Sequence, residues 1–173
     1  LLRAQQYTFD KIGLEEGLPT AGINAICEGP AGFTWLASEG AGLLRYDGYS
    51  FENYGLEDFP VVEELIFDSI SQQLLWHDGK SIWHYDGLSF KMLWQANSAV
   101  EQILASQYGP LVIADQTLWS IQGDSLIKLG SLIAPNSKLI RSSIGLFLIQ
   151  EKLERLRRQN DSWQRETFAD SII

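Results

Sequence analysis

The chain has 173 residues, of which 45% are hydrophobic and 20% are charged, a composition typical of a globular domain rather than a disordered segment. Its formal net charge of −9 argues against nucleic acid and anionic membrane surfaces as partners, because phosphate groups are bound by Lys and Arg. No stretch approaches the roughly 20 apolar residues of a membrane-spanning helix, so this segment is expected to make no membrane contact itself.

A degenerate repeat of about 35–40 residues organises the sequence. Residues 46–51 and 85–90 share the pattern Tyr-Asp-Gly-x-Ser-Phe, and weaker copies follow near residues 117–126 and 153–163. The equivalent positions, spaced 39, 36 and 35 residues apart, are Tyr46, Tyr85, Ile121 and Leu156. A period of this size predicts units that stack or are arranged radially.

Short apolar runs alternate with Gly, Asp, Asn and Pro turns, a pattern that predicts many short strands. We expect four strands in each repeat, in chain order at 22–28, 33–38, 42–47 and 49–54; at 62–70, 73–77, 80–86 and 88–93; at 99–106, 110–114, 116–122 and 125–129; and at 137–143, 146–150, 152–157 and 162–168. Residues 151–158 have helical propensity, but the repeat alignment predicts a strand there.

Four antiparallel strands per repeat make a β-propeller blade, in which each sheet hides the apolar face of its neighbour. The predicted fold class is therefore an all-β propeller, one partial domain over 1–173 with repeats at about 14–55, 56–94, 95–130 and 131–168. Residues 7–13 resemble an outer strand that is left over and would complete another blade. The ring of about four blades is thus expected to be incomplete, either as a fragment of a larger propeller or as a half that pairs with a second copy.

The first repeat carries the most specific pattern in the chain. It has Gly-Leu-Pro at 17–19, an apolar inner strand at 23–26, Gly-Phe-Thr-Trp-Leu-Ala-Ser at 32–38 and Gly-Leu-Leu-Arg-Tyr-Asp-Gly at 42–48. This pattern resembles the two-component regulator propeller repeat. The resemblance is partial in the second repeat and faint in the third and fourth, and Ala37 and Ser38 stand where the family has Gly-Thr.

The resemblance implies a periplasmic sensor segment of a bacterial inner-membrane receptor. In such receptors the propeller precedes a transmembrane helix and a histidine kinase, often hybrid, or a diguanylate cyclase module, which would lie outside this chain. Ligands in the family are often saccharides. The expected function is therefore non-catalytic ligand sensing or protein interaction, with other blades of the parent chain or a second copy as partners.

Candidate ligand-binding residues lie on loops that join an outer strand to the next inner strand. Such loops line one face of a propeller, and they carry Glu15, Glu16, Glu57 and Asp58. These carboxylates are interpreted either as contacts to saccharide hydroxyls or cations, or as solvated loop charge. Trp94 is expected on a strand-to-strand loop, where it would offer an aromatic platform for a ligand.

No phosphate loop, His-Glu-x-x-His or Cys-x-x-Cys motif is present, so we expect no catalytic residue, metal or cofactor. His77 is interpreted as a surface residue at a turn, His84 as a half-exposed packing residue and Cys27 as a buried, inert thiol. A propeller lyase or glycoside hydrolase remains an alternative that would need a His and acids from different blades on one face. A stand-alone lectin or adaptor is the other alternative.

Overall fold

The computed structural model describes residues 10–55, 57–132, 134, 137–143, 145–150, 152–160 and 162–169, with the backbone alone for 168 and 169. Within these ranges, sixteen strands form four antiparallel four-stranded sheets, each in plain sequence order. The expected all-β fold built from propeller blades is confirmed. Residues 7–9 of the expected leftover strand lie outside the described residues, and residues 10–13 form no strand.

The first two blades contain β1 (Ile23–Glu28), β2 (Thr34–Ser38), β3 (Leu43–Tyr46) and β4 (Phe51–Tyr54), then β5 (Glu64–Asp68), β6 (Gln73–His77), β7 (Ser81–Tyr85) and β8 (Phe90–Gln95). The last two contain β9 (Val100–Ser106), β10 (Gly109–Ala114), β11 (Thr117–Gln122) and β12 (Ser125–Ser131), then β13 (Lys138–Ser142), β14 (Gly145–Ile149), β15 (Leu153–Gln159) and β16 (Ser162–Ala169). Strand β15 confirms the repeat-based expectation over helical propensity at 151–158.

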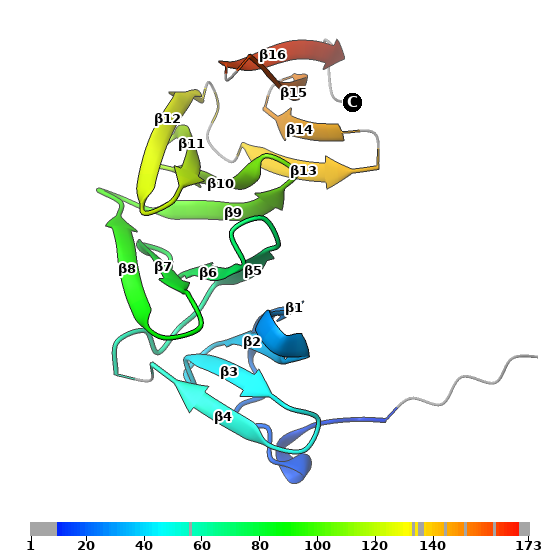
Figure 1. Cartoon of the computed structure of the whole chain (residues 1–173), viewed down its shortest axis with the longest axis vertical. Coiled ribbons are helices and arrows are strands. Elements are labelled where there is room, and N and C mark those ends of the chain that lie inside the picture. The colour runs from blue at the N-terminus through cyan, green and yellow to red at the C-terminus, as the bar shows by residue number, and fades with distance from the viewer. Residues whose placement is uncertain are drawn as a thin grey trace, which may run out of the picture.

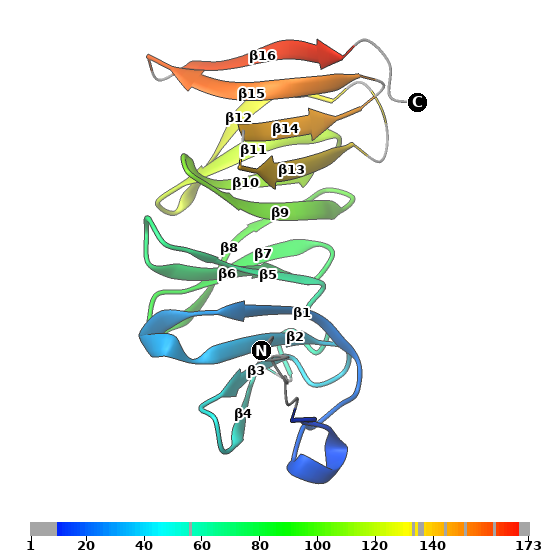
Figure 2. The same cartoon turned by 90° about the vertical axis from the view of Figure 1, so that its right-hand side faces the viewer.

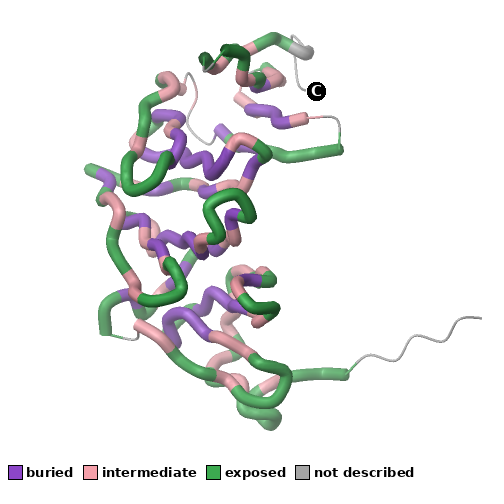
Figure 3. The backbone as a smooth tube through the Cα atoms, in the orientation of Figure 1, coloured by how far each residue is buried: buried purple, intermediate pink, exposed green. Residues whose placement is uncertain are grey.

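The four blades follow one another along an arc (Figures 1 and 2), with the inner strands β1, β5, β9 and β13 next to one another. Two short 3-10 helices, η1 (Leu14–Glu16) and η2 (Pro30–Gly32), lie in the first repeat. No helix in the described ranges has the length and apolarity to cross a bilayer. Buried residues concentrate in the middle strands and between neighbouring sheets (Figure 3).

The shared Tyr-Asp-Gly-x-Ser-Phe pattern builds the same hairpin turn in two blades. In the first blade, Asp47 Oδ1 accepts hydrogen bonds from the backbone N–H groups of Tyr49 and Ser50, each at 2.8 Å. The hydroxyl of Tyr46 donates to the carbonyl of Gly48 at 2.8 Å. Gly48 has φ of 101°, a left-handed conformation that glycine adopts at no steric cost.

The second blade repeats these bonds at equivalent positions. Asp86 Oδ1 accepts from the N–H groups of Leu88 and Ser89, each at 2.9 Å, and Tyr85 donates to Gly87 O at 2.9 Å. Phe90 then stacks on Tyr85 with ring centroids 4.6 Å apart. The most recognisable motif of the sequence is therefore a structural turn, since its polar groups are used inside the hairpin.

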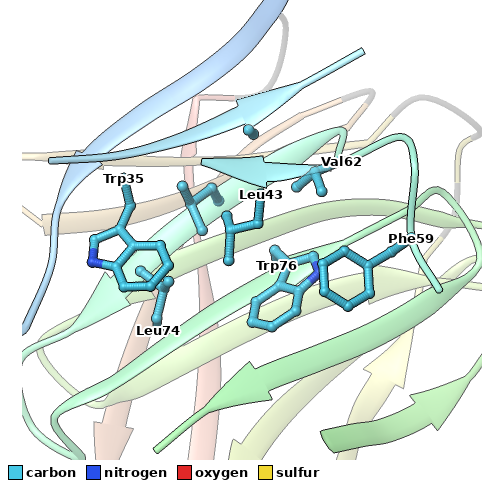
Figure 4. Packing of buried hydrophobic residues seen from close by; sticks show 8 residues of the cluster. Trp35, Leu43, Phe59, Val62, Leu74 and Trp76 are labelled. Carbon is cyan, nitrogen blue, oxygen red and sulfur yellow. The ribbon is translucent and has the colours of Figure 1, made fainter. Parts of the chain in front are cut away.

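Apolar clusters fill the interfaces between blades. Between the first and second blades, Trp35 and Leu43 face Leu74 and Trp76, and Phe59 from the connecting loop packs against Trp76 with ring centroids 5.1 Å apart (Figure 4). Similar clusters join the second blade to the third and the third to the fourth. Each fully buried large apolar side chain stabilises the fold by roughly 1.5–3 kcal/mol.

Candidate functional site

One end of the blades carries the loops that join each outer strand to the next inner strand and the loops that join each second strand to its third. We call this end the loop face. Backbone hydrogen bonds tie the two kinds of loop together, from Gly42 N to Pro60 O, Ala96 N to Lys80 O and Asp115 N to Ala99 O. Backbone hydrogen bonds therefore hold the two kinds of loop to one another.

A hollow of about 450 Å³ opens on the loop face beside the inner strands. Its lining comes from three blades and includes Asn24, Glu63, Glu64, His77, Val100 and Glu101. We call it the acidic hollow. Glu63 and Glu64 are neighbours in the chain, and both line the hollow because Glu63 precedes β5, which begins at Glu64.

His77 lines the acidic hollow. The expectation of a surface residue is wrong, since only 3% of His77 is exposed. Its Nδ1 accepts a hydrogen bond from Gly79 N at 3.1 Å, which leaves the proton of the neutral ring on Nε2. Nε2 lies 3.5 Å from Glu64 Oε2 and has no hydrogen-bond partner among the described residues.

One carboxylate of the acidic hollow is held by the neighbouring blade. Glu64 Oε2 accepts a hydrogen bond from Ile103 N at 2.7 Å, which fixes the side chain across the junction of the second and third blades. Partial loss of its water shell raises the pKa of Glu101 above its ordinary value, and the nearby charge of Asp115 adds to this. The hollow therefore offers several hydrogen-bond acceptors. The described residues hold no cluster of three His, Cys, Asp or Glu arranged to bind a metal ion.

A second hollow of about 480 Å³ lies on the outer rim of the loop face. It is lined by Asp58, Phe59, Asp78, Lys80, Trp83 and Met92, among others. We call it the rim hollow. Trp83 donates its indole N–H to Asp78 Oδ2 at 3.0 Å and stacks on Trp76 with an interplanar angle of 8°. An aromatic ring beside carboxylates suits a polar ligand with an apolar face.

The sequence-predicted acids fall at three different places. Glu15 and Glu16 lie in η1 and are exposed, and Glu16 Oε2 accepts a hydrogen bond from Gly13 N at 2.7 Å. Glu57 is exposed and lines neither hollow. Asp58 lines the rim hollow. The structure thus brings one of the four predicted acids into a concave site, and the ligand-binding role of all four stays a prediction.

Trp94 does not lie on a loop, which corrects the sequence-based placement. Strand β8 runs two residues further than expected, to Gln95, and a register shift after Ile82 places Trp94 opposite Ile82. Its ring packs against Trp119 of the third blade, with centroids 5.6 Å apart. Trp94 is therefore a packing residue between blades in this structure.

The acidic hollow was missed by sequence reasoning, although the chain carries a signal for it. Residues 74–77 are buried without interruption, because second strands are covered on both faces. A continuous apolar run that ends in a histidine therefore indicates a buried imidazole. The other part of the signal, acids at the starts of successive inner strands, becomes visible only when the repeats are superposed.

No family model and no curated protein matches the sequence. Solved structures do match. The extracellular domain of BT3049 from B. thetaiotaomicron, described as a hybrid two-component system, has a TM-score of 0.67 at 17% identity, covering 92% of this chain and 26% of that chain. Two structures of the extracellular domain of BT4673 from the same organism, described as a hybrid two-component and as a one-component system, have TM-scores of 0.56 and 0.55 at 17% and 16% identity.

The BT4673 matches cover 94% and 86% of this chain but 23% and 22% of those chains. The chain thus spans about a quarter of the length of the structures it matches. At these identities the likeness establishes the fold. The matched proteins are extracellular domains described as parts of two-component and one-component systems, and the two-component type is the one that the sequence resemblance implies.

Proposed function

We propose that the chain is part of a ligand-sensing or interaction propeller in the periplasmic portion of a bacterial signalling receptor, and that it has no catalytic role of its own. The observation that carries this proposal is the likeness, over 92% of the chain, to the extracellular domain of a protein described as a hybrid two-component system, at a TM-score of 0.67. The output module, a histidine kinase or a diguanylate cyclase, would lie elsewhere in the parent protein.

The acidic hollow is the proposed ligand site, and a neutral saccharide is the proposed ligand class. Carboxylates such as Glu63, Glu64 and Glu101 accept hydrogen bonds from hydroxyl groups, and they line one concave surface. A volume of about 450 Å³ lies in the range of small-molecule sites. Because the lining comes from three blades, a bound ligand would favour one arrangement of the blades, which supports a sensing role.

An enzyme is the competing function, and one observation favours it. His77 lies with Glu64 and Glu101, acids from two blades on one face, as a propeller lyase or hydrolase would need. However, a general base must reach the proton that it abstracts, and Nε2 of His77 is buried with no accessible surface. The burial of this atom is why we favour binding over catalysis.

Calorimetric titration of the chain with a panel of neutral oligosaccharides tests the proposal. We expect one member to bind, and Glu101→Gln or Glu64→Gln to weaken its binding at least tenfold, since each removes a charged acceptor. Glu57→Gln, an exposed loop acid outside both hollows, is the matched control. Absence of binding by the whole panel, or equal binding by all variants, would overturn the site. Turnover of a panel member would favour the enzyme instead.

The first blade presents an uncovered apolar position on the side away from the second blade. Ile26 in β1 is 63% exposed, and it pairs across the sheet with Leu36. We propose that a further propeller blade, from the same parent chain or from a second copy, covers this face, because blades hide each other's apolar faces. Sedimentation velocity distinguishes the sources, since only the second-copy version gives a concentration-dependent dimer that Ile26→Lys abolishes.

A further inference from the structure

The end of the blades opposite the loop face also carries a hollow. Its lining is basic, whereas that of the acidic hollow carries carboxylates. It has a volume of about 610 Å³ and lies against the loops that join first to second strands in the second, third and fourth blades. Its lining includes Ser69, Ser106, Arg141, Ser143, Gly145 and Arg155. We call it the arginine hollow. We propose that it binds a small organic anion carrying carboxylate or sulfate groups, independently of the ligand of the acidic hollow.

The charge of this lining is opposite to that of the molecule. The chain has a formal net charge of −9, yet the described residues that line the arginine hollow include two arginines and no acid. Guanidinium groups match oxyanions in geometry as well as charge, because their N–H groups point outward in one plane. Two such groups in one concave site select for anions against an acidic background.

Arg141 is fixed at the junction of two blades. From β13 its Nη1 donates to the carbonyl of Ala105 in β9 at 3.3 Å. This is its one hydrogen bond within the described part of the chain, and a guanidinium has five N–H donors. The side chain is therefore positioned by the neighbouring blade while donors remain for a ligand.

Arg155 packs against Gly145, where the absence of a side chain leaves space for its guanidinium group. Gly145 begins β14 with φ of 151°, and a Cβ at this position would lie 3.0 Å from Nε and 3.2 Å from Nη2 of Arg155. The guanidinium thus lies against the bare backbone of Gly145. This packing brings a charge from the third strand of the fourth blade to the same hollow as Arg141.

The remaining lining suits an oxyanion as well. Hydroxyl groups of Ser69 and Ser143 come from the loops of the second and fourth blades. Hydroxyls and guanidiniums together donate hydrogen bonds to several oxygens of one ligand, and a volume of this size admits a molecule larger than a lone inorganic ion. A di- or tricarboxylate, or an organic sulfate, has the charge and size that this lining fits.

Two other arginines of this region have partners away from the hollow and do not line it. Arg157 Nε lies 3.4 Å from Glu166 Oε2, and Arg165 donates through Nη1 and Nη2 to Ser131 O at 3.4 Å. Among the described basic residues between 152 and 165, Arg155 is the one that lines the hollow together with Arg141.

Titration of the intact chain with citrate, with benzene disulfonate and with uncharged glycerol tests the proposal. We expect citrate or the disulfonate to bind, glycerol not to bind, and added salt to weaken the binding of the anion. Arg141→Gln and Arg155→Gln are each expected to weaken binding at least tenfold. Arg165→Gln, which removes an arginine outside the hollow, is the control and should leave binding unchanged.

Chemical-shift mapping keeps the proposal testable if a variant fails to fold. In the unaltered chain, citrate should shift the backbone amides of Ser142, Ser143 and Gly145 in a saturable way. Absence of anion binding up to 10 millimolar, an undiminished affinity in both hollow variants, or shifts that map elsewhere would each overturn the proposal. An equal loss in the Arg165→Gln control would indicate nonspecific charge attraction and would overturn it too.

Discussion

The side-chain amide of Gln102 in β9 exchanges two hydrogen bonds with the backbone of Leu139 in β13. Leu139 N donates to Oε1 at 2.7 Å, and Nε2 donates to Leu139 O at 3.0 Å. The two strands belong to different sheets. The side-chain amide therefore links neighbouring blades by a donor and an acceptor, as a peptide group links neighbouring strands within a sheet. Packing alone is adjustable, whereas this paired bond fixes how far one inner strand is displaced along the next.

The other blade junctions use the same device with different residues. Asn24 Nδ2 donates to Val62 O at 2.9 Å between the first and second blades, and Ile103 N donates to Glu64 Oε2 between the second and third. Each of the first three inner strands therefore presents one polar side chain to the backbone of the next repeat. In the acidic hollow this bracing residue is Glu64, so the proposed ligand site lies on a blade junction.

Replacing Gln102 by Ala should lower the free energy of unfolding by about 1–3 kcal/mol, because two hydrogen bonds of about 0.5–1.5 kcal/mol each are lost. Urea denaturation followed by tryptophan fluorescence measures this. Gln102→Glu retains an acceptor for Leu139 N but loses the donor, so an intermediate loss is expected. Gln95→Ala, at an exposed strand position, is the control. Equal stability of the Gln102 and Gln95 variants would show that the junction bond contributes nothing.

Gly55 should tolerate no side chain. A Cβ there would overlap the ring of Phe59, which is 2% exposed, and φ is 70°. We expect Gly55→Ala to cost about 2–3 kcal/mol or more, from displaced core and backbone strain together. At Gly48 φ is also positive, at 101°, but an added Cβ would meet no neighbouring atom. The Gly48→Ala variant therefore measures the cost of backbone strain alone. Thermal melts of both variants should place Gly55→Ala well below Gly48→Ala.

His84 should make stability depend on pH. It is 2% exposed between the second and third blades, not half-exposed as the sequence suggested, and neither ring nitrogen has a hydrogen-bond partner among the described residues. Burial lowers its pKa below the ordinary 6.5, against an opposing effect of Asp124 and Asp86. The unfolded chain therefore binds the proton first. Stability is full above about pH 6.5 and falls as the pH drops through the folded-state pKa.

The test compares unfolding free energies of the unaltered chain and His84→Leu between pH 7.5 and 5. The loss for one proton is at most about 1.4 kcal/mol per pH unit, and His84→Leu should flatten the curve. Asp47, Asp86 and Asp115 have pKa values lowered by hydrogen bonds, so their contributions are lost only below about pH 4. An unchanged slope in His84→Leu would assign the effect to another group.

Strand positions were readable from the sequence because alternation and turn residues are local signals. Strand β6 begins and ends where expected, and β15 forms despite the helical propensity of residues 151–158. The sequence-based predictions are wrong at positions where contacts between strands or blades determine the burial or the register. The sequence predicts a loop at Trp94 because the register shift after Ile82 has no local signature. It gives no sign that His77 and His84 are buried, at 3% and 2% exposure, because that burial depends on contacts outside their own strands.

The candidate sites were less predictable than the fold. Each hollow gathers side chains from several repeats, so its lining depends on which blades are neighbours and how far the inner strands are displaced. Arg141 and Arg155 lie in different strands and line the same hollow, and the guanidinium of Arg155 packs against Gly145, where a side chain would crowd it. The repeat pattern could place each residue within its own blade, but it could not bring residues of different blades together.

Cys27 should be unreactive in the folded chain. Its side chain packs beside the first blade interface, and burial raises the pKa of the thiol from 9.0 to about 12. The thiolate is the reactive form, so the raised pKa leaves far less nucleophile at pH 8 than a free thiol would have. Ellman's reagent should therefore modify the native chain far more slowly than the chain in 8 M urea. Since Cys27 is the only cysteine, the absorbance change has one source.

Rapid stoichiometric modification of the native chain would mean that β1 opens readily. The Ile26→Lys and Gln102→Ala variants would then show whether a blade junction controls that opening.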